Sequence, residues 1–157
     1  MATNLERMQI MMEEIGPSMP EIEAVIQSEN TNWAIQFEDQ SIVMLEWAEQ
    51  PDRVVLTTML GTPSESMQLS VYETLLCYNL LWRDNGGVKV GLAGPQGALI
   101  ISAEVCLEGM SLMNLQEELN KFLKITRSWV QHIAQASESG DAEPPALPGM
   151  GNMHLHA

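Results

Sequence analysis

The stretch LLWRDNGGVKVGLAGPQGALIISAEV, residues 80–105, contains the signals that decide the fold. It continues an amphipathic run, and residues 84–87 (Asp-Asn-Gly-Gly) tolerate a left-handed backbone, so a helix is predicted to end there. From Val88 onward apolar residues occupy alternate positions, which predicts a strand. Residues 94–97 (Gly-Pro-Gln-Gly) predict a turn, and residues 98–105 predict a second strand. The stretch therefore describes a helix that leads into a β-hairpin.

Composition limits the classes of protein that this chain can represent. Its 157 residues are 45% hydrophobic, which is enough for one folded domain with a substantial core. It has 21 acidic and 7 basic residues, giving a formal net charge of −14. Nucleic acids and anionic membranes need basic residues, so neither is expected as a partner, although acidity also serves solubility. No run of about 20 apolar residues and no signal-peptide pattern is present, so we expect a cytoplasmic protein.

The N-terminal segment predicts a helix with two open interpretations. Residues 3–6 (Thr-Asn-Leu-Glu) match the capping-box pattern, and Gly16-Pro17 predict the helix end. Leu5, Met8, Met12 and Ile15 recur along it at helical spacing. This methionine-rich stripe indicates either packing in a core or an adaptable binding surface, because methionine is flexible and polarizable. The connector that follows, up to Asn30, shows a weak helical or extended pattern at residues 22–26, and the sequence leaves its structure open.

From Asn32 the hydrophobic period changes to two, which predicts strands. A short turn at Asp39-Gln40 separates a first strand from a second over residues 41–48, and a third covers residues 53–60. The side chains predicted to share one face of the first two strands are Trp33, Ile35, Phe37, Val43, Leu45 and Trp47. The short connections predict an antiparallel meander.

Two further helices complete the predicted domain. The central helix begins at Ser64 or Ser70, and its apolar residues occupy more than one face, so it needs two packing partners. The last helix begins at Ser111 or Asn114. The predicted fold is α+β with the order α-βββ-α-ββ-α, an antiparallel sheet packed by helices, over residues 1–136. The Gly-, Pro- and acid-rich residues 137–157 predict a disordered tail.

Residues that could carry catalysis or bind a metal are few. Cys77 and Cys106 lie in apolar surroundings, which favours buried free thiols over a disulfide or a reactive thiol. His154 and His156 lack the further ligands that a specific metal site needs, and His132 is expected at the solvent boundary of the last helix. No Gly-rich phosphate loop is present. We therefore expect no enzymatic activity, no cofactor and no metal.

One segment resembles a known family. Residues 78–82 (Tyr-Asn-Leu-Leu-Trp), followed by residues 84–87 and the hairpin, resemble the second helix, its Asn-Gly-Gly-type stop and the fourth and fifth strands of class I type III secretion chaperones. This is the CesT or Tir-chaperone family of bacteria. The predicted order of elements and the acidic composition are similar too, so the resemblance covers Thr3 to about Ala136 and leaves out the tail.

The resemblance implies a function and two sets of contact residues. Family members bind the N-terminal region of a secreted effector in extended form, keep it soluble in the cytoplasm and deliver it to the export machinery, whose ATPase would be a further partner. The family's effector-binding surface matches Met8, Met12, Ile15, Trp33, Ile35, Phe37 and Trp47. The family's homodimer interface, on the second helix and the neighbouring strand, matches Leu75, Tyr78, Asn79, Trp82, Val88 and Val90.

Two alternatives of other classes stay open. A non-chaperone regulator or scaffold with the same fold would sequester a partner protein. A small enzyme would use Cys77 or Cys106. An unfolded client would bind through apolar anchors in grooves and by adding a strand to a free sheet edge, so the identity of the native partner separates the first alternative from a chaperone.

Overall fold

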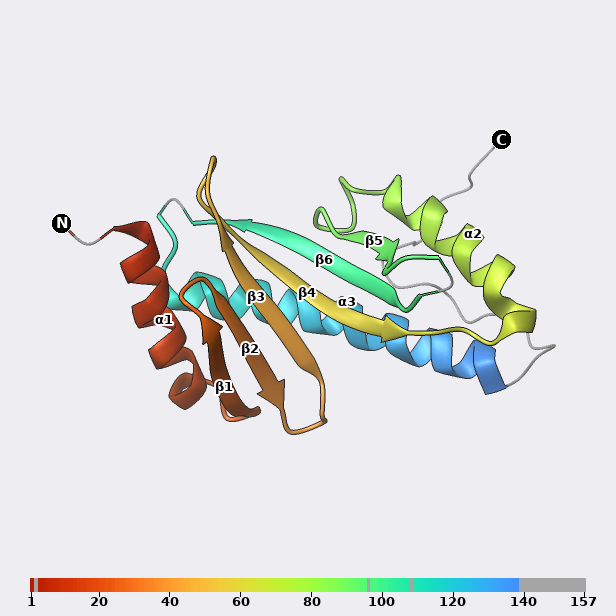
Figure 1. The fold of residues 1–157 in the computed structure, drawn as a ribbon, viewed down its shortest axis with the longest axis horizontal. Coiled ribbons are helices and arrows are strands. Elements are labelled where there is room, and N and C mark those ends of the chain that lie inside the picture. The colour runs from red at the N-terminus through yellow and green to blue at the C-terminus, as the bar shows by residue number, and fades with distance from the viewer. Residues whose placement is uncertain (2, 96, 108, 139–157) are drawn as a thin grey trace. The chain divides into compact units, whose positions relative to one another are not determined.

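The structure, a computed structural model, describes residues 1, 3–95, 97–107 and 109–138. Its elements in chain order are α1 (Asn4–Ser18), β1 (Ile22–Glu29), β2 (Asn32–Phe37), β3 (Ile42–Ala48), β4 (Arg53–Gly61), the 3-10 helix η1 (Glu65–Met67), α2 (Gln68–Asn79), β5 (Lys89–Leu92), β6 (Leu99–Cys106) and α3 (Leu112–Glu138). The strands form a six-stranded sheet in the order β1-β2-β3-β4-β6-β5 (Figure 1). The α+β class with an antiparallel sheet is confirmed.

The chain divides into two compact units. Unit 1 comprises residues 1–58 and 102–122, and so contains α1, β1, β2 and β3. Unit 2 comprises residues 59–101 and the chain from Leu123 onward, and so contains η1, α2 and β5. Strands β4 and β6 and helix α3 each contribute residues to both units.

Helix α1 begins where its capping signal predicts. The Thr3 hydroxyl accepts a hydrogen bond from the Glu6 backbone N–H (3.2 Å), and the Glu6 carboxylate accepts one from the Thr3 N–H (2.6 Å). These two bonds satisfy helical donors that would otherwise lack partners. The helix continues through Pro17 to Ser18, slightly beyond the predicted end, because the Met19 N–H still reaches the Ile15 carbonyl oxygen.

Strand β1 lies in the connector that the sequence pattern left open between a helix and an extended segment. It pairs antiparallel with β2, with Val25 opposite Ile35, and its register shifts near both ends. None of its side chains is fully buried, and only Ile22, Ala24 and Val25 are partly buried. A strand exposed in this way shows no alternation of apolar and polar residues. The meander therefore has four strands, and the predicted count of three is wrong.

Strands β2 and β3 follow the predicted alternation and build the core of unit 1. Trp33 lies opposite Leu45 and Ile35 opposite Val43, and these side chains are buried. The hairpin between the strands turns at Gln40, whose φ of 69° lies in the left-handed region. One face of each strand is buried while the other is accessible, as the period of two predicts.

Helix α2 of unit 2 begins and ends differently from the prediction. It follows η1 directly and has no side-chain cap, so Ser64 precedes η1 and Ser70 lies inside the helix. It ends at Asn79, before the predicted stop, and residues 80–87 form turns. Gly86 and Gly87 adopt φ values of 72° and 77°, which confirms the left-handed backbone expected there.

The predicted hairpin and the predicted last helix are both present in the structure, as β5 with β6 and as α3. The Ala93 N–H donates to the Ala98 carbonyl oxygen (2.9 Å), which closes the β5–β6 connection. The Ser111 hydroxyl accepts from the Asn114 N–H (3.2 Å), so Ser111 rather than Asn114 caps α3. Residues 137 and 138 belong to α3, not to the predicted tail. The rest of that tail, residues 139–157 with His154 and His156, lies outside the described residues.

Candidate functional site

The residues predicted to contact an effector lie in the core of unit 1. Their exposed fractions range from 0% to 6%, and they are Met8, Met12, Ile15, Trp33, Ile35, Phe37 and Trp47. This burial supports the interpretation of the methionine stripe as core packing. In this conformation they offer no surface to a partner, so direct contact with an effector stays a prediction for them. The accessible groups around this core are the candidates for a binding surface.

A groove of about 590 Å³ lies between α1 and strand β1, within unit 1. Helix α1 passes close to the strand at Gly16, where a Cβ atom would lie 3.5 Å from Val25 Cγ2. The groove's lining includes Gln9 and Glu13 from the helix and Val25 from the strand. A hollow beside a sheet edge is a place where an extended segment can lie.

Strand β1 offers an unpaired backbone edge next to this groove. It is the first strand in the sheet order, and among the described residues it pairs with β2 alone. Between its two register shifts, residues Ala24 to Gln27 pair regularly with Trp33 to Gln36. Register irregularities near the ends of an edge strand discourage indiscriminate strand pairing, whereas a regular central run can accept one further strand. The central run of β1 is therefore a candidate for strand addition.

The accessible face of the sheet in unit 1 carries a row of four residues, three of them apolar, that crosses four strands. Ile26 lies opposite Ala34, Ala34 opposite Met44, and Met44 opposite Thr57. We call these four residues the outer row. Ile26 is 56% exposed and Met44 is 44% exposed, and Ile42, two residues before Met44 on β3, is also exposed. Contiguous exposed apolar side chains of this kind mark interaction surfaces.

The charges at the groove are of one sign. Glu13 of α1 and Glu23 of β1 line it and are exposed, and no lysine or arginine is among its described lining residues. The Glu23 carboxylate accepts a hydrogen bond from the Gln36 side-chain amide (3.2 Å), which leaves its negative charge uncompensated. The groove is therefore an anionic recess with Met12 and Val25 as apolar lining.

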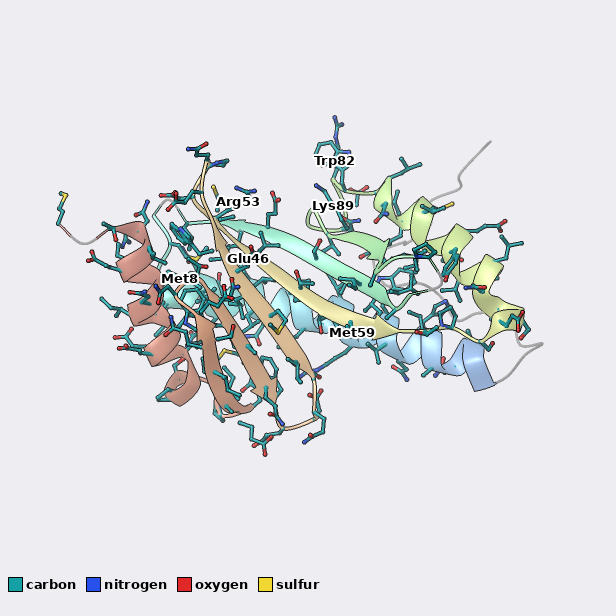
Figure 2. All side chains as sticks on the ribbon, viewed as in Figure 1. Met8, Glu46, Arg53, Met59, Trp82 and Lys89 are labelled. Atoms are coloured by element: carbon teal, nitrogen blue, oxygen red, sulfur yellow. The ribbon has the colours of Figure 1, made fainter. Side chains whose placement is uncertain are left out.

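The residues predicted to form a dimer interface take two positions in unit 2. Leu75, Tyr78 and Val88 are buried inside the unit. The predicted positions also include Asn79 and Val90, which are half-buried and joined to each other by hydrogen bonds. Trp82 is 57% exposed and projects from the ribbon beyond the end of α2 (Figure 2). Of the predicted set, Trp82 has the most accessible side chain.

Helix α2 carries an exposed apolar face that the sequence pattern did not single out. Leu69, Leu76 and Leu80 are 71%, 67% and 75% exposed. Their spacings of seven and four residues place them on one side of the helix. Because α2 is apolar on more than one side, its sequence could not indicate which side the protomer buries. The structure buries the side with Val71, and the side with the three leucines remains open.

Unit 2 also contains a buried aromatic cluster. The rings of Tyr78 and Trp129 meet edge to face at 4.9 Å between centroids, and those of Trp129 and His132 at 5.6 Å. His132 is 4% exposed, so its predicted place at the solvent boundary is wrong. Burial lowers the pKa of His132 and raises the pKa of Tyr78. Burial therefore disfavours the charged form of each group.

Neither cysteine is paired, and their environments differ. Cys77 is partly buried, whereas Cys106 is exposed, so the expectation of burial is wrong for Cys106. The side chain of Val105 takes the buried position in β6, and successive side chains of a strand point to opposite faces. In the described part of the chain, no three His, Cys, Asp or Glu side chains gather where they could hold a metal ion. The described helices include none that is both long and apolar enough to cross a membrane.

Comparison with solved structures shows a shared fold. A chain of the HopA1–SchA chaperone–effector complex matches with a TM-score of 0.66 at 16% identity, covering 83% of this chain and 98% of that chain. A chain of the ExsC–ExsE complex matches with a TM-score of 0.66 at 15% identity, covering 85% and 97%. A structure of the Yersinia pestis type III secretion chaperone SycH with a fragment of YscM2 matches with a TM-score of 0.57 at 16% identity, covering 76% and 97%.

The sequence comparison gives the family. No curated protein sequence matches the chain significantly. The sequence profile of the Tir chaperone protein (CesT) family matches residues 22–130, which run from β1 into α3. Because this match covers more than half of the 157 residues, the protein belongs to the Tir chaperone (CesT) family.

Proposed function

We propose that the protein is a cytoplasmic chaperone that binds the N-terminal region of a type III secreted effector in extended form. The effector stays soluble and competent for secretion while it is bound. The observation that carries the proposal is the regular, unpaired edge of β1 beside the α1–β1 groove. Family membership and the fold shared with chaperone–effector complexes support it.

The proposed mechanism uses the backbone of the effector. A strand added to residues Ala24 to Gln27 would form main-chain hydrogen bonds that do not depend on its side chains. Because side chains alternate along a strand, one set would face the groove, and the other would extend the outer row beyond Ile26. The first set of side chains would contact Val25 in the groove, and the second would contact Ile26. One chaperone could therefore hold different sequences in the same extended conformation.

A homodimer is part of the proposal, with a different set of contacts from that predicted. Ordering an unfolded segment costs conformational entropy, so its binding must bury a large surface. A second protomer doubles the surface that is available to the segment. The exposed face of α2, with Leu69, Leu76, Leu80 and Trp82, is the proposed contact. Leu75, Tyr78 and Val88 support that face from inside the protomer. The export-machinery ATPase is the proposed recipient of the chaperone–effector complex.

Co-purification with candidate effector N-terminal regions tests the proposal. Ile26→Lys and Met44→Lys place a charge on the outer row at exposed positions, where the fold can accommodate it. Each should weaken effector binding about tenfold, because an apolar contact is replaced by a charge that must be desolvated. Met113→Lys on α3, at a 66% exposed position, is the control. Equal binding by all variants, or no effector that binds the wild-type chain, would contradict the proposal.

The identity of the partner separates a chaperone from a regulator or scaffold of the same fold. A secreted protein that is captured unfolded, and loses solubility without this chain, supports a chaperone. A folded regulator captured in its place would support partner sequestration instead. The proposed role uses backbone edges and apolar surfaces, and it requires no catalytic group.

A further inference from the structure

The charges around the α1–β1 groove define the chemistry of its occupant. We propose that the groove takes a basic extended segment, in which lysine or arginine alternates with apolar residues. This inference rests on the proposed function and specifies the client segment that binds there. Glu13 of the helix and Glu23 of the strand line the groove, the Glu23 carboxylate being hydrogen-bonded to the Gln36 side chain, and the described lining contains no cation.

Among the residues that the structure describes, the carboxylates of the groove have no basic partner. The ion pairs of the described residues join Arg53 to Glu104 (3.4 Å) and Lys121 to Glu118 (3.1 Å), away from the groove lining. The basic residue of α1, Arg7, donates to the Met110 carbonyl oxygen. A cationic client would therefore gain attraction without displacing an internal partner.

The apolar lining explains why a long basic side chain fits better than a purely polar one. Val25 lines the groove and is partly exposed, whereas Met12, which also lines it, is buried, and Glu13 is exposed to solvent. Lysine and arginine can lay their aliphatic stems along apolar surface and keep the charged group in water. The stem would cover Val25, and the charged end would approach Glu13. An acidic side chain in the same place would be repelled.

Strand geometry sets the spacing of these residues. Alternate side chains of an added strand lie about 7 Å apart on one face, so basic residues at every second position would face the groove. The residues between them would point to the other face, next to exposed Ile26 of the outer row. The structure thus favours an amphipathic strand with one basic face and one apolar face.

Two short synthetic peptides of equal length test the inference on the full chain. One alternates lysine with valine, and the other replaces each lysine by glutamine. Fluorescence anisotropy should show tighter binding of the lysine peptide by about tenfold at low ionic strength, with the difference reduced by salt. The lysine peptide should also compete with an effector N-terminal region.

A matched pair of variants separates the groove from the general acidity of the chain. Glu13→Gln and Glu14→Gln lie on the same helix and change the net charge equally, but Glu13 alone of the two lines the groove. Glu13→Gln should weaken lysine-peptide binding about two- to fivefold, and Glu14→Gln should have a smaller effect. Equal effects of the two variants would overturn the inference, because non-specific attraction would then explain the preference.

The outcomes also distinguish this inference from the proposed function. If the glutamine peptide binds as tightly as the lysine peptide, or if neither binds while an effector N-terminal region still does, the inference is wrong and the chaperone function stands. If no effector N-terminal region binds the wild-type chain, the proposed function fails first. A lysine preference that depends on Glu13 supports the inference.

Discussion

Asn79 at the end of α2 holds Val90 of β5 through two hydrogen bonds. Its side-chain amide donates to the Val90 carbonyl oxygen (2.9 Å), and its side-chain oxygen accepts from the Val90 N–H (2.8 Å). The side chain thus occupies both backbone groups of one strand residue. This pair fixes the helix against the strand in unit 2, the arrangement that the residue pattern of the helix stop and hairpin suggested.

Asn79→Ala should destabilise the protein by about 1–3 kcal/mol, because the N–H and carbonyl groups of a half-buried residue lose their partners. The free energy of unfolding from urea titrations measures this effect. Asn120→Ala, at an exposed position of α3, is the control and should change it little. Equal stability of the two variants would show that the Asn79 bonds contribute nothing net.

Leu76→Asp should convert the proposed dimer to a monomer without unfolding it. Leu76 is 67% exposed in the protomer, and burying such a side chain contributes about 1.5–3 kcal/mol at each symmetric contact. Light scattering after size-exclusion chromatography gives the mass, and circular dichroism checks the fold. Val130→Asp, also on an exposed helical position, should leave the dimer intact. A wild-type chain that is monomeric at micromolar concentration would contradict the dimer proposal.

His132 should make the stability depend on pH. Its pKa is lowered from 6.5 in the folded state by burial, so the unfolded chain binds the proton more readily. The contribution of the neutral His132 imidazole to the free energy of unfolding is therefore fully present above about pH 6.5. It is lost as the pH falls toward the pKa of the folded state.

His132→Leu isolates this effect from that of the carboxylates. Urea unfolding between about pH 8 and about pH 5 should show a smaller loss of stability on acidification for the variant than for the wild type. Parallel pH profiles for the two proteins would be the adverse result.

The cysteines should differ in reactivity, and neither should be needed for function. Cys106 is exposed and Cys77 is partly buried, so a maleimide reagent should label Cys106 first in the native protein. Cys106→Ala and Cys77→Ala should each bind an effector like the wild type. Loss of function with either variant at unchanged stability would favour the alternative of a thiol-dependent enzyme.

The fold could be predicted wherever an element has one buried side. Trp33, Ile35 and Phe37 alternate because one face of β2 is buried, and that pattern located the strand. Strand β1 lacks the pattern because none of its side chains is buried. Helix α2 ends at Asn79, where the chain passes into turns, and the glycines at 86 and 87 come later in those turns, so the predicted stop located the left-handed backbone but not the last helical residue.

The binding surfaces were less predictable than the fold for a physical reason. Periodicity shows which side chains share a face, but it does not show what covers that face. Met8 and Trp33 each lie on an apolar face that the protomer itself buries, whereas Leu76 lies on a face that the protomer leaves open. The groove depends on α1 lying beside β1, a tertiary relationship that no local pattern encodes.

Hydrogen exchange of the β1 amides, with and without a bound effector N-terminal region, tests the central claim most directly. Strand addition predicts slower exchange of the outward-facing amides among Ala24 to Gln27, because they would gain hydrogen-bonding partners. Protection elsewhere on the chain, with β1 exchange unchanged under saturating effector, would contradict the account.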